Sequence, residues 1–210
     1  MPNHVVTRIT FSEDRYQEIF DRITTLREKT EHRDAQVEVD FNKLIPMPEE
    51  LLVTSDGLVM NLTNKFTMQY PITRLVAELK KADEKTIDNF CLAVKNLNKL
   101  GHADWYNWSI ENWGTKWNAY SCEFDFPTIK FETAWALPDP IIQKLSETFP
   151  DAWMLVEYAD EDYGSNLGRF NILNGKRNAL DIPEPLDEWA MRMHGHDDAS
   201  IEEYRREQAE

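Results

Sequence analysis

Two similar strand-and-helix patterns, one near each end of the chain, constrain the fold more than any other feature of the sequence. At the N-terminal end, apolar residues alternate with others over 4–11, as in a half-buried strand. Over 13–29 they recur at helical spacing, and Glu13 and Asp14 suit the positive end of a helix dipole. Alternation returns over 36–43. This stretch predicts a strand–helix–strand unit.

The second half of the chain shows the same order of patterns. Pro140 falls at the first position of an apolar helical pattern, which predicts a helix over 139–149. Two such half-units favour an α+β fold, with one largely antiparallel sheet and the helices 13–29 and 139–149 on the same face. Strands are expected here at 116–126, 128–135, 152–159 and 168–173.

The remaining segments suggest how the domain is elaborated. We expect residues 1–180 to form a single domain that carries a mostly helical insertion at about 46–115. Residues 181–210 hold 10 acidic and 3 basic side chains and are expected to form an acidic helical tail.

Composition restricts the classes of function. The 210 residues include 23 Lys and Arg against 38 Asp and Glu, a net charge of −15, which disfavours binding to nucleic-acid phosphates. No apolar run is long enough for a membrane span, and the N-terminus lacks the pattern of a signal peptide. We therefore expect a cytoplasmic protein. Cys91 and Cys122 are interpreted as buried, reduced thiols.

Tryptophans are concentrated in one region, where six of the seven lie within 49 residues. A helix over 104–113 would carry aromatic rings around more than half of its circumference, too wide an arc for one flat core. Either the helix is packed between two layers or one side of it faces a partner. Gly114 is expected to end this helix with a positive φ.

The segment Trp108–Asn118 resembles the signature of the YubB-type ferredoxin-like family, a domain of unknown function found on bacteriophages, plasmids and integrated elements. Two further segments resemble the family, and the resemblance spans roughly 36–175. It implies a ferredoxin-like split βαβ core carrying a helical, Trp-rich insertion, and it supplies no catalytic residues. The further segments are Phe41–Pro48 and Phe131–Trp135, followed by Pro138 and the pair Phe149–Pro150.

Two segments have donor atoms for metals, and neither fits a known pattern. The acidic run that begins at Asp160 resembles the start of a calcium loop, but Ser165 and Asn171 occupy the positions that require glycine and glutamate. His194 and His196 lack the further ligands of a structural zinc site. We expect no metal and no cofactor.

The sequence contains no recognised catalytic motif, although a triad assembled only in space would leave no such trace. Glu111 and Glu132 lie in the resembling segments and could pair with Lys116 or Lys130, in acid–base work or in a purely structural role. No catalytic residue is assigned.

These observations lead to one functional hypothesis and two alternatives. The first is a non-enzymatic interaction protein of a phage or plasmid that acts on a host or defence protein. The alternatives are an enzyme or small-ligand binder with a site where the Trp-rich insertion meets the sheet, and a nucleic-acid-binding domain. The candidate binding surface comprises Trp105, Trp108, Glu111, Trp113, Lys116, Asp160, Glu161 and Asp162.

Overall fold

The computed structural model describes residues 3–28, 34–52 and 57–208. The chain forms two compact units. The first comprises Met1–Pro46 together with Asn112–Glu210, and the second is Met47–Glu111, where the sequence analysis placed a helical insertion.

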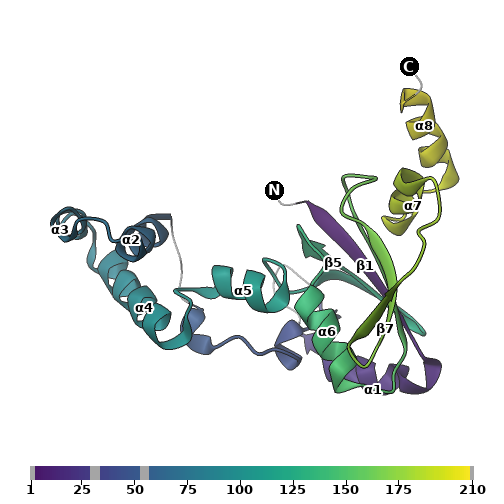
Figure 1. The fold of residues 1–210 in the computed structure, drawn as a ribbon, viewed down its shortest axis with the longest axis horizontal. Helices are drawn as coiled ribbons and strands as arrows, with labels where there is room; N and C mark the ends of the chain where they lie inside the picture. Colours follow the sequence, from purple (N-terminus) through teal and green to yellow (C-terminus); the bar gives the residue numbers. More distant parts are fainter. Residues whose placement is uncertain (1–2, 29–33, 53–56, 209–210) are drawn as a thin grey trace. The chain divides into compact units, whose positions relative to one another are not determined.

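The first unit contains the sheets and the C-terminal helices (Figure 1). Its N-terminal elements are β1 (His4–Phe11), α1 (Glu13–Ile23), β2 (Thr24–Arg27), β3 (Gln36–Val39) and a 3-10 turn, η1 (Phe41–Lys43). Its later elements are β4 (Tyr120–Asp125), β5 (Thr128–Ala134), α6 (Asp139–Thr148), β6 (Met154–Asp160), β7 (Gly168–Leu173), β8 (Lys176–Ala179), α7 (Leu186–Met193) and α8 (Asp198–Gln208).

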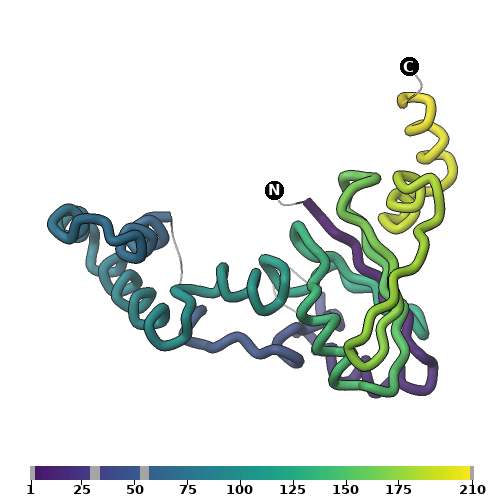
Figure 2. Tube along the Cα trace, viewed as in Figure 1, coloured from purple at the N-terminus to yellow at the C-terminus, as the bar shows by residue number. Residues whose placement is uncertain are grey.

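The main sheet has six strands in the order β4-β5-β1-β6-β7-β8, and every neighbouring pair is antiparallel. Figure 2 shows the N-terminal strand running beside strands from the second half of the chain. Because β5 lies between β1 and β4, the unit β1-α1-β4 is split by an inserted strand. This is the ferredoxin-like split βαβ arrangement, and the predicted α+β fold is confirmed.

One face of the sheet is apolar and carries both predicted helices. Ile9 of β1 is paired with Ile129 of β5, and both are buried. The ring of Phe20 in α1 lies 5.2 Å from that of Phe124 in β4. The fully buried Ile142 marks the inward side of α6. This face therefore forms the main core, as the strand alternation predicted.

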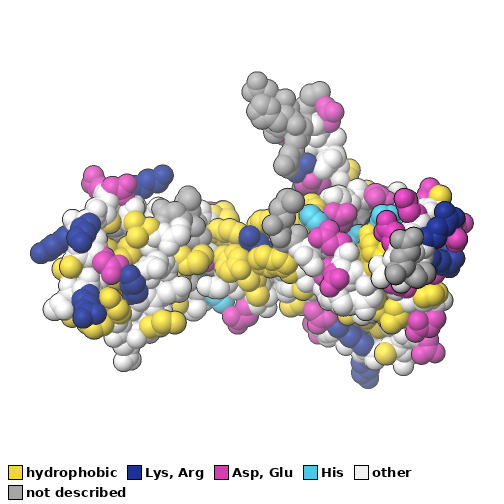
Figure 3. Space-filling model, turned by 90° about the horizontal axis from the view of Figure 1, so that it is seen from above, with side chains coloured by type: hydrophobic (Ala, Val, Ile, Leu, Met, Phe, Trp, Pro, Cys, Tyr) yellow, Lys and Arg dark blue, Asp and Glu magenta, His cyan; other side chains and the backbone are white. Residues whose placement is uncertain are grey.

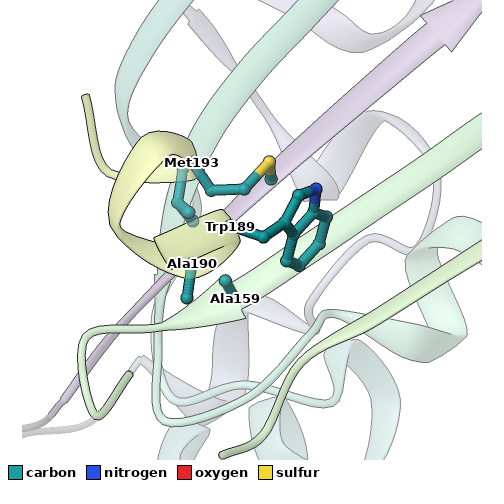
Figure 4. Close-up of a cluster of buried hydrophobic side chains, with 5 residues drawn as sticks. Ala159, Trp189, Ala190 and Met193 are labelled. Atoms are coloured by element: carbon teal, nitrogen blue, oxygen red, sulfur yellow. The ribbon is translucent and has the colours of Figure 1, made fainter. Parts of the chain in front are cut away.

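The opposite face is covered in part by α7, which the sequence analysis assigned to the tail. Val6 of β1 and Ala159 of β6 pack against Trp189, Ala190 and Met193 of the helix (Figure 4). Burying a tryptophan removes a large apolar area from water, which is enough to hold a short helix on a sheet.

The helix predicted over 13–29 is wrong at its C-terminal end, since α1 stops at Ile23. Thr24 has an extended backbone, and its hydroxyl donates to the Phe20 carbonyl at 2.7 Å. The following residues form β2, which pairs with β3 in a separate two-stranded sheet. A β-branched pair of threonines at the end of the helix favours this change to strand. Residue 29 itself lies outside the described residues.

The strand predicted over 36–43 is also corrected. It ends at Val39 and belongs to the small sheet, and the prediction of a single sheet is wrong for it. The Asp40 carboxylate accepts from the Asn42 amide N–H at 3.0 Å, a local hydrogen bond that caps the 3-10 turn over Phe41–Lys43.

In the second half of the chain, one strand boundary and one additional strand differ from the prediction. The strand predicted from 116 begins only at Tyr120. Just before it, the Asn118 side chain accepts from the backbone N–H groups of Phe41 at 2.9 Å and Ala119 at 3.0 Å, local contacts that compete with strand pairing. An additional strand, β8, pairs with β7 to form a hairpin, and Asn174 and Gly175 in the turn between them both have positive φ. That pair of conformations is typical of a tight two-residue hairpin turn.

The second unit is helical. Asp83 caps α4 by accepting from the Thr86 N–H at 2.8 Å, and Gly101, with φ of +78°, ends the helix. Cys91 on α4 is exposed, which corrects the interpretation of both cysteines as buried. The elements are η2 (Glu49–Leu51), α2 (Gly57–Thr67), α3 (Ile72–Leu79), α4 (Glu84–Leu100) and most of α5 (Trp105–Trp113), whose last two residues belong to the first unit. The core of the second unit contains Leu62, Leu75 and Phe90.

Candidate functional site

Two tryptophans of the candidate surface are interior side chains. Trp113 is 4% exposed, its indole N–H donates to the Ile45 carbonyl at 2.9 Å, and its ring meets Phe41 edge to face at 5.8 Å. Trp108 is 7% exposed. Both rings are buried as core side chains are, and the N–H of Trp113 is paired as well, so the packed alternative describes these two residues.

The other candidates fall in both compact units. Trp105, Trp108 and Glu111 belong to the unit Met47–Glu111, where the Glu111 carboxylate lies 3.5 Å from His102. Trp113, Lys116 and the acidic run from Asp160 belong to the other unit. In that unit, Lys116 and the acidic run lie near two exposed tryptophans outside the predicted surface, Trp117 and Trp135.

Lys116 lies against two exposed indole rings that the sequence analysis did not select. Its Nζ is 4.3 Å from the ring centroid of Trp117 and 5.1 Å from that of Trp135. Trp117 is 39% exposed and Trp135 is 42% exposed. Both distances fall within the range of a cation–π interaction. We call the pair Trp117 and Trp135, which Lys116 contacts, the tryptophan slot.

The backbone of Trp135 is in an uncommon conformation, with φ of +70°. Its N–H donates to the Asn3 carbonyl at 2.9 Å, and its carbonyl accepts from the Asn166 side chain at 3.1 Å. The Thr115 hydroxyl donates to the carbonyl of the preceding Ala134 at 2.8 Å. A strained conformation costs about 1–3 kcal/mol and persists only where surrounding contacts enforce it, so these hydrogen bonds hold the backbone from which the exposed ring projects.

An acidic loop lies beside the slot and is joined to it by Asn166. The same Asn166 amide that holds Trp135 also donates to Asp160 at 2.7 Å. Asp160 is 4% exposed and accepts as well from Asn3 and from the Asp162 N–H. Asp160 therefore organises the loop from within, whereas Glu161 and Asp162 present exposed side chains.

A histidine, a tyrosine and a glutamate meet at the same end of the sheet. His4 Nδ1 lies 2.8 Å from the Tyr120 hydroxyl and 3.8 Å from the Glu132 carboxylate. Burial, and then the nearby charges of Glu132 and Glu161, raises the pKa of Tyr120 to about 12, so this phenol is neutral at physiological pH. The predicted pairing of Glu132 with Lys130 is not the one the structure describes, since Lys130 lies 3.4 Å from Glu123.

Charged side chains also cross the part of the sheet face that bears Arg8. Glu157, which is 6% exposed, accepts from Arg8 Nε and from Arg169 Nε, each at 3.0 Å. Each cation in this row therefore lies beside a carboxylate, which lowers its attraction for phosphate. Figure 3 shows acidic side chains among hydrophobic ones on the face that it displays. A hollow of about 200 Å³ in this region is lined by Arg8, Glu123, Asp125, Thr128 and Lys130.

A larger hollow, of about 510 Å³, lies between β4 and the small sheet. Within it Arg27 and Glu38 form an ion pair at 2.8 Å. Neither Glu111 nor Glu132 is among its lining residues, which are Arg27, Asp34, Gln36, Glu38, Tyr120 and Ser121.

Across residues 3–28, 34–52 and 57–208, no group of three or more His, Cys, Asp or Glu side chains is arranged to hold a metal ion. Over the same ranges, no helix has both the length and the apolar character needed to cross a bilayer.

The split βαβ core and its antiparallel sheet define this protein as one with a ferredoxin-like domain. Residues 113–201 match the family model described as the ferredoxin-like domain in Api92-like protein. A search of solved structures matched the crystal structure of a protein api92 from Yersinia pseudotuberculosis, with 8% sequence identity, a TM-score of 0.37, and coverage of 87% of this chain and 99% of that chain. A search of curated proteins found no match.

Sequence reasoning missed the most exposed part of the site. Trp117 and Trp135 were visible only as members of the tryptophan-rich region, and Trp135 fitted the alternation of a strand. Its positive φ depends on hydrogen bonds from Asn3 and Asn166, which are far from it in the sequence. No local pattern in the amino-acid sequence indicates hydrogen bonds between residues so far apart in the chain.

Proposed function

We propose that this protein is a non-enzymatic interaction module that binds another protein through the tryptophan slot and the neighbouring acidic loop. The supporting observation is the pair of exposed indoles, Trp117 and Trp135, which both lie within cation–π distance of Lys116 and of which Trp135 has a hydrogen-bonded backbone. Tryptophan is enriched among the few side chains that supply most of the binding energy at protein interfaces. Fixing its position before binding reduces the entropy lost on association.

The biological setting of the proposal comes from the resemblance of Trp108–Asn118 to YubB-type proteins of phages and plasmids. In that setting the partner is a host or defence protein in the bacterial cytoplasm. The acidic balance, with a net charge of −15, is compatible with a partner that carries a basic surface.

The two alternatives draw on weaker observations. A nucleic-acid-binding sheet would need cations that are not balanced by carboxylates, whereas Arg8 and Arg169 share Glu157. An enzyme could use His4 beside Tyr120 and Glu132, but a tyrosine whose pKa is about 12 is a poor general base near neutral pH. We therefore place protein binding first.

The test is affinity capture from a bacterial lysate with four forms of the full-length chain: wild type, Trp117→Ala, Trp135→Ala and Trp153→Ala. Trp153 is a matched control, because it is 39% exposed and has no cation–π contact with Lys116. We expect a protein that is retained by the wild type and the control and lost with both slot variants. Retention of the same proteins by all four forms would contradict the proposal.

A further inference from the structure

The slot has the form of a binding site for a cation, and this identifies the chemistry of the partner. Building on the proposed function, we infer that Trp117 and Trp135 are the two walls of a site for an arginine side chain from a basic segment of the partner. In the unbound protein, Lys116 occupies this site as an internal substitute.

The distances support a shared cation. A single ammonium, Lys116 Nζ, lies 4.3 Å from one ring centroid and 5.1 Å from the other. Cation–π attraction operates within about 6 Å of a ring centroid and is strongest for tryptophan. The two rings are therefore placed to interact with the same positive charge, which in the unbound protein is that of Lys116.

The shape of an arginine suits this site better than that of a lysine. A guanidinium is planar and more weakly hydrated than an ammonium, so it stacks on an aromatic face at a smaller desolvation cost. Both indoles remain about two-fifths exposed beside Lys116, at 39% and 42%. Surface is thus left on each ring for a larger, flat cation to cover.

Charges around the slot favour a segment with more than one basic residue. Glu161 and Asp162 are exposed, and their loop is tied to Trp135 through Asn166. Glu161 also contributes to raising the pKa values of Tyr120 and Tyr163, which places its charge near both phenols. A guanidinium in the slot would bring neighbouring basic side chains close to these carboxylates, where opposite charges attract.

The backbone geometry indicates that the site is formed before binding. Trp135 keeps its positive φ because Asn3 and Asn166 bond both sides of its peptide. A backbone fixed in this way needs little rearrangement when a cation enters. In this proposal the incoming cation displaces the Lys116 ammonium from the two rings.

The test uses the full-length protein and a synthetic peptide in which arginine alternates with glycine. A matched peptide contains citrulline, which has nearly the shape of arginine without the charge. Affinity is measured by isothermal titration calorimetry, and thermal unfolding confirms that each variant is folded. We expect Trp117→Leu and Trp135→Leu each to weaken binding of the arginine peptide roughly tenfold, with Trp153→Leu unchanged. Equal binding by all three variants, or equal binding of the citrulline peptide, would overturn the inference.

Substitutions of Lys116 test whether it acts as the internal substitute. Lys116→Ala should bind the arginine peptide more tightly than the wild type, because the slot is empty. Lys116→Arg should bind it more weakly, because the internal cation competes better. If only the net charge of the protein mattered, Lys116→Arg would bind the arginine peptide with the affinity of the wild type. Equal affinities of Lys116→Arg and the wild type would therefore contradict the role given to Lys116.

The outcome is separable from the proposed function. A lysate partner whose capture depends on Trp117 and Trp135, combined with no binding of the arginine peptide, would refute the arginine site and leave the interaction module intact. Specific binding of the peptide at the slot, with no partner that depends on these tryptophans, would support the site and refute the broader proposal.

Discussion

Two separate features of the structure require glycine at position 114, one in the backbone conformation and one in the packing. The φ of +80° at Gly114 is the conformation in which glycine commonly ends a helix, here directly after Trp113. The predicted helix end and positive φ are therefore confirmed. The structure adds a packing constraint, because a Cβ at this position would lie 2.7 Å from Pro140 Cδ and 3.0 Å from the Asp139 backbone nitrogen.

We expect Gly114→Ala to destabilise the protein by about 2–3 kcal/mol, since it combines an unfavourable φ with a contact that the backbone must relieve. Gly195 is the matched control, because it has φ of +87° and no atom within 4 Å of a built Cβ. Gly195→Ala should cost only about 1 kcal/mol. Chemical denaturation of both variants measures the difference, and equal losses of stability would argue against the packing constraint.

Trp113 illustrates why a tryptophan in a signature segment need not be a binding residue. Trp113→Ala should lower the free energy of unfolding by about 3–5 kcal/mol, because it empties a core position. Trp113→Phe should cost less, since it keeps an aromatic ring beside Phe41 and mainly loses the hydrogen bond to Ile45. Normal stability of Trp113→Ala would instead indicate an exposed functional ring.

At the scale of elements, the C-terminal helices show how a charged tail can be ordered. Ile201 of α8 is 1% exposed, and Arg205 donates to both oxygens of Glu188 on α7, with Nη2 at 2.6 Å from Oε2. The hydrogen bonds from Arg205 hold the pKa of Glu188 below its ordinary value. Hydrogen bonds from Ser200 likewise lower the pKa of Asp197, which precedes α8.

This pair of lowered pKa values predicts a pH dependence for α8. A carboxylate whose pKa is lower in the folded state contributes stability above its unfolded pKa and loses it as the pH falls through the folded value. The amide protons of α8 should therefore exchange faster with solvent as the pH drops below about 4, beyond the intrinsic change in exchange rate. In Glu188→Gln the protection should already be reduced at pH 7. Protection of α8 that is equal in both proteins would contradict a role for Glu188.

At the scale of the whole molecule, the second unit is connected to the first at two neighbouring points. The Trp113 indole N–H donates to the Ile45 carbonyl at 2.9 Å, and these residues flank the segment Met47–Glu111. A short linker can therefore replace that segment without stretching the chain.

We expect a chain in which residues 47–111 are replaced by about four Gly and Ser residues to fold cooperatively, since each linker residue spans up to about 3.5 Å. Circular dichroism and thermal unfolding provide the measurement. A linker of the same composition inserted at Asn174–Gly175, within the tight hairpin, is the contrasting case and should disrupt β7 and β8. Failure of the shortened chain to unfold cooperatively would show that the sheet depends on the second unit.

Net charge gives a prediction for association with a partner. With a charge of −15, binding to a basic protein should be electrostatically steered, so the association rate should fall as salt rises past about 0.15 M. Removal of residues 197–210 should leave binding largely intact, because the proposed surface lies at the tryptophan slot. Stopped-flow measurement of the captured partner tests this, and a rate that does not depend on salt would show that charge does not guide the encounter.

Local pattern was sufficient for much of the fold. The alternation over 4–11, the helix beginning at Asp139 and the strand Gly168–Leu173 could be read from the sequence, because side-chain periodicity follows directly from backbone geometry. The conformation of Gly114 was predictable for the same reason, since its chemistry is local to the helix end.

Only the tertiary structure decided which residues form the candidate site. Trp113 and Trp117 belong to one short segment, yet the first is 4% exposed and the second 39%, a difference set by packing against Phe41 and Ile45. Trp135 is positioned by Asn3 and Asn166, more than 30 residues away in either direction. The sequence by itself determined the α+β class and most of the strands and helices, and its resemblance to a family implied the ferredoxin-like core. Burial and strain arise from contacts between distant segments and were decided only when the sheet was assembled.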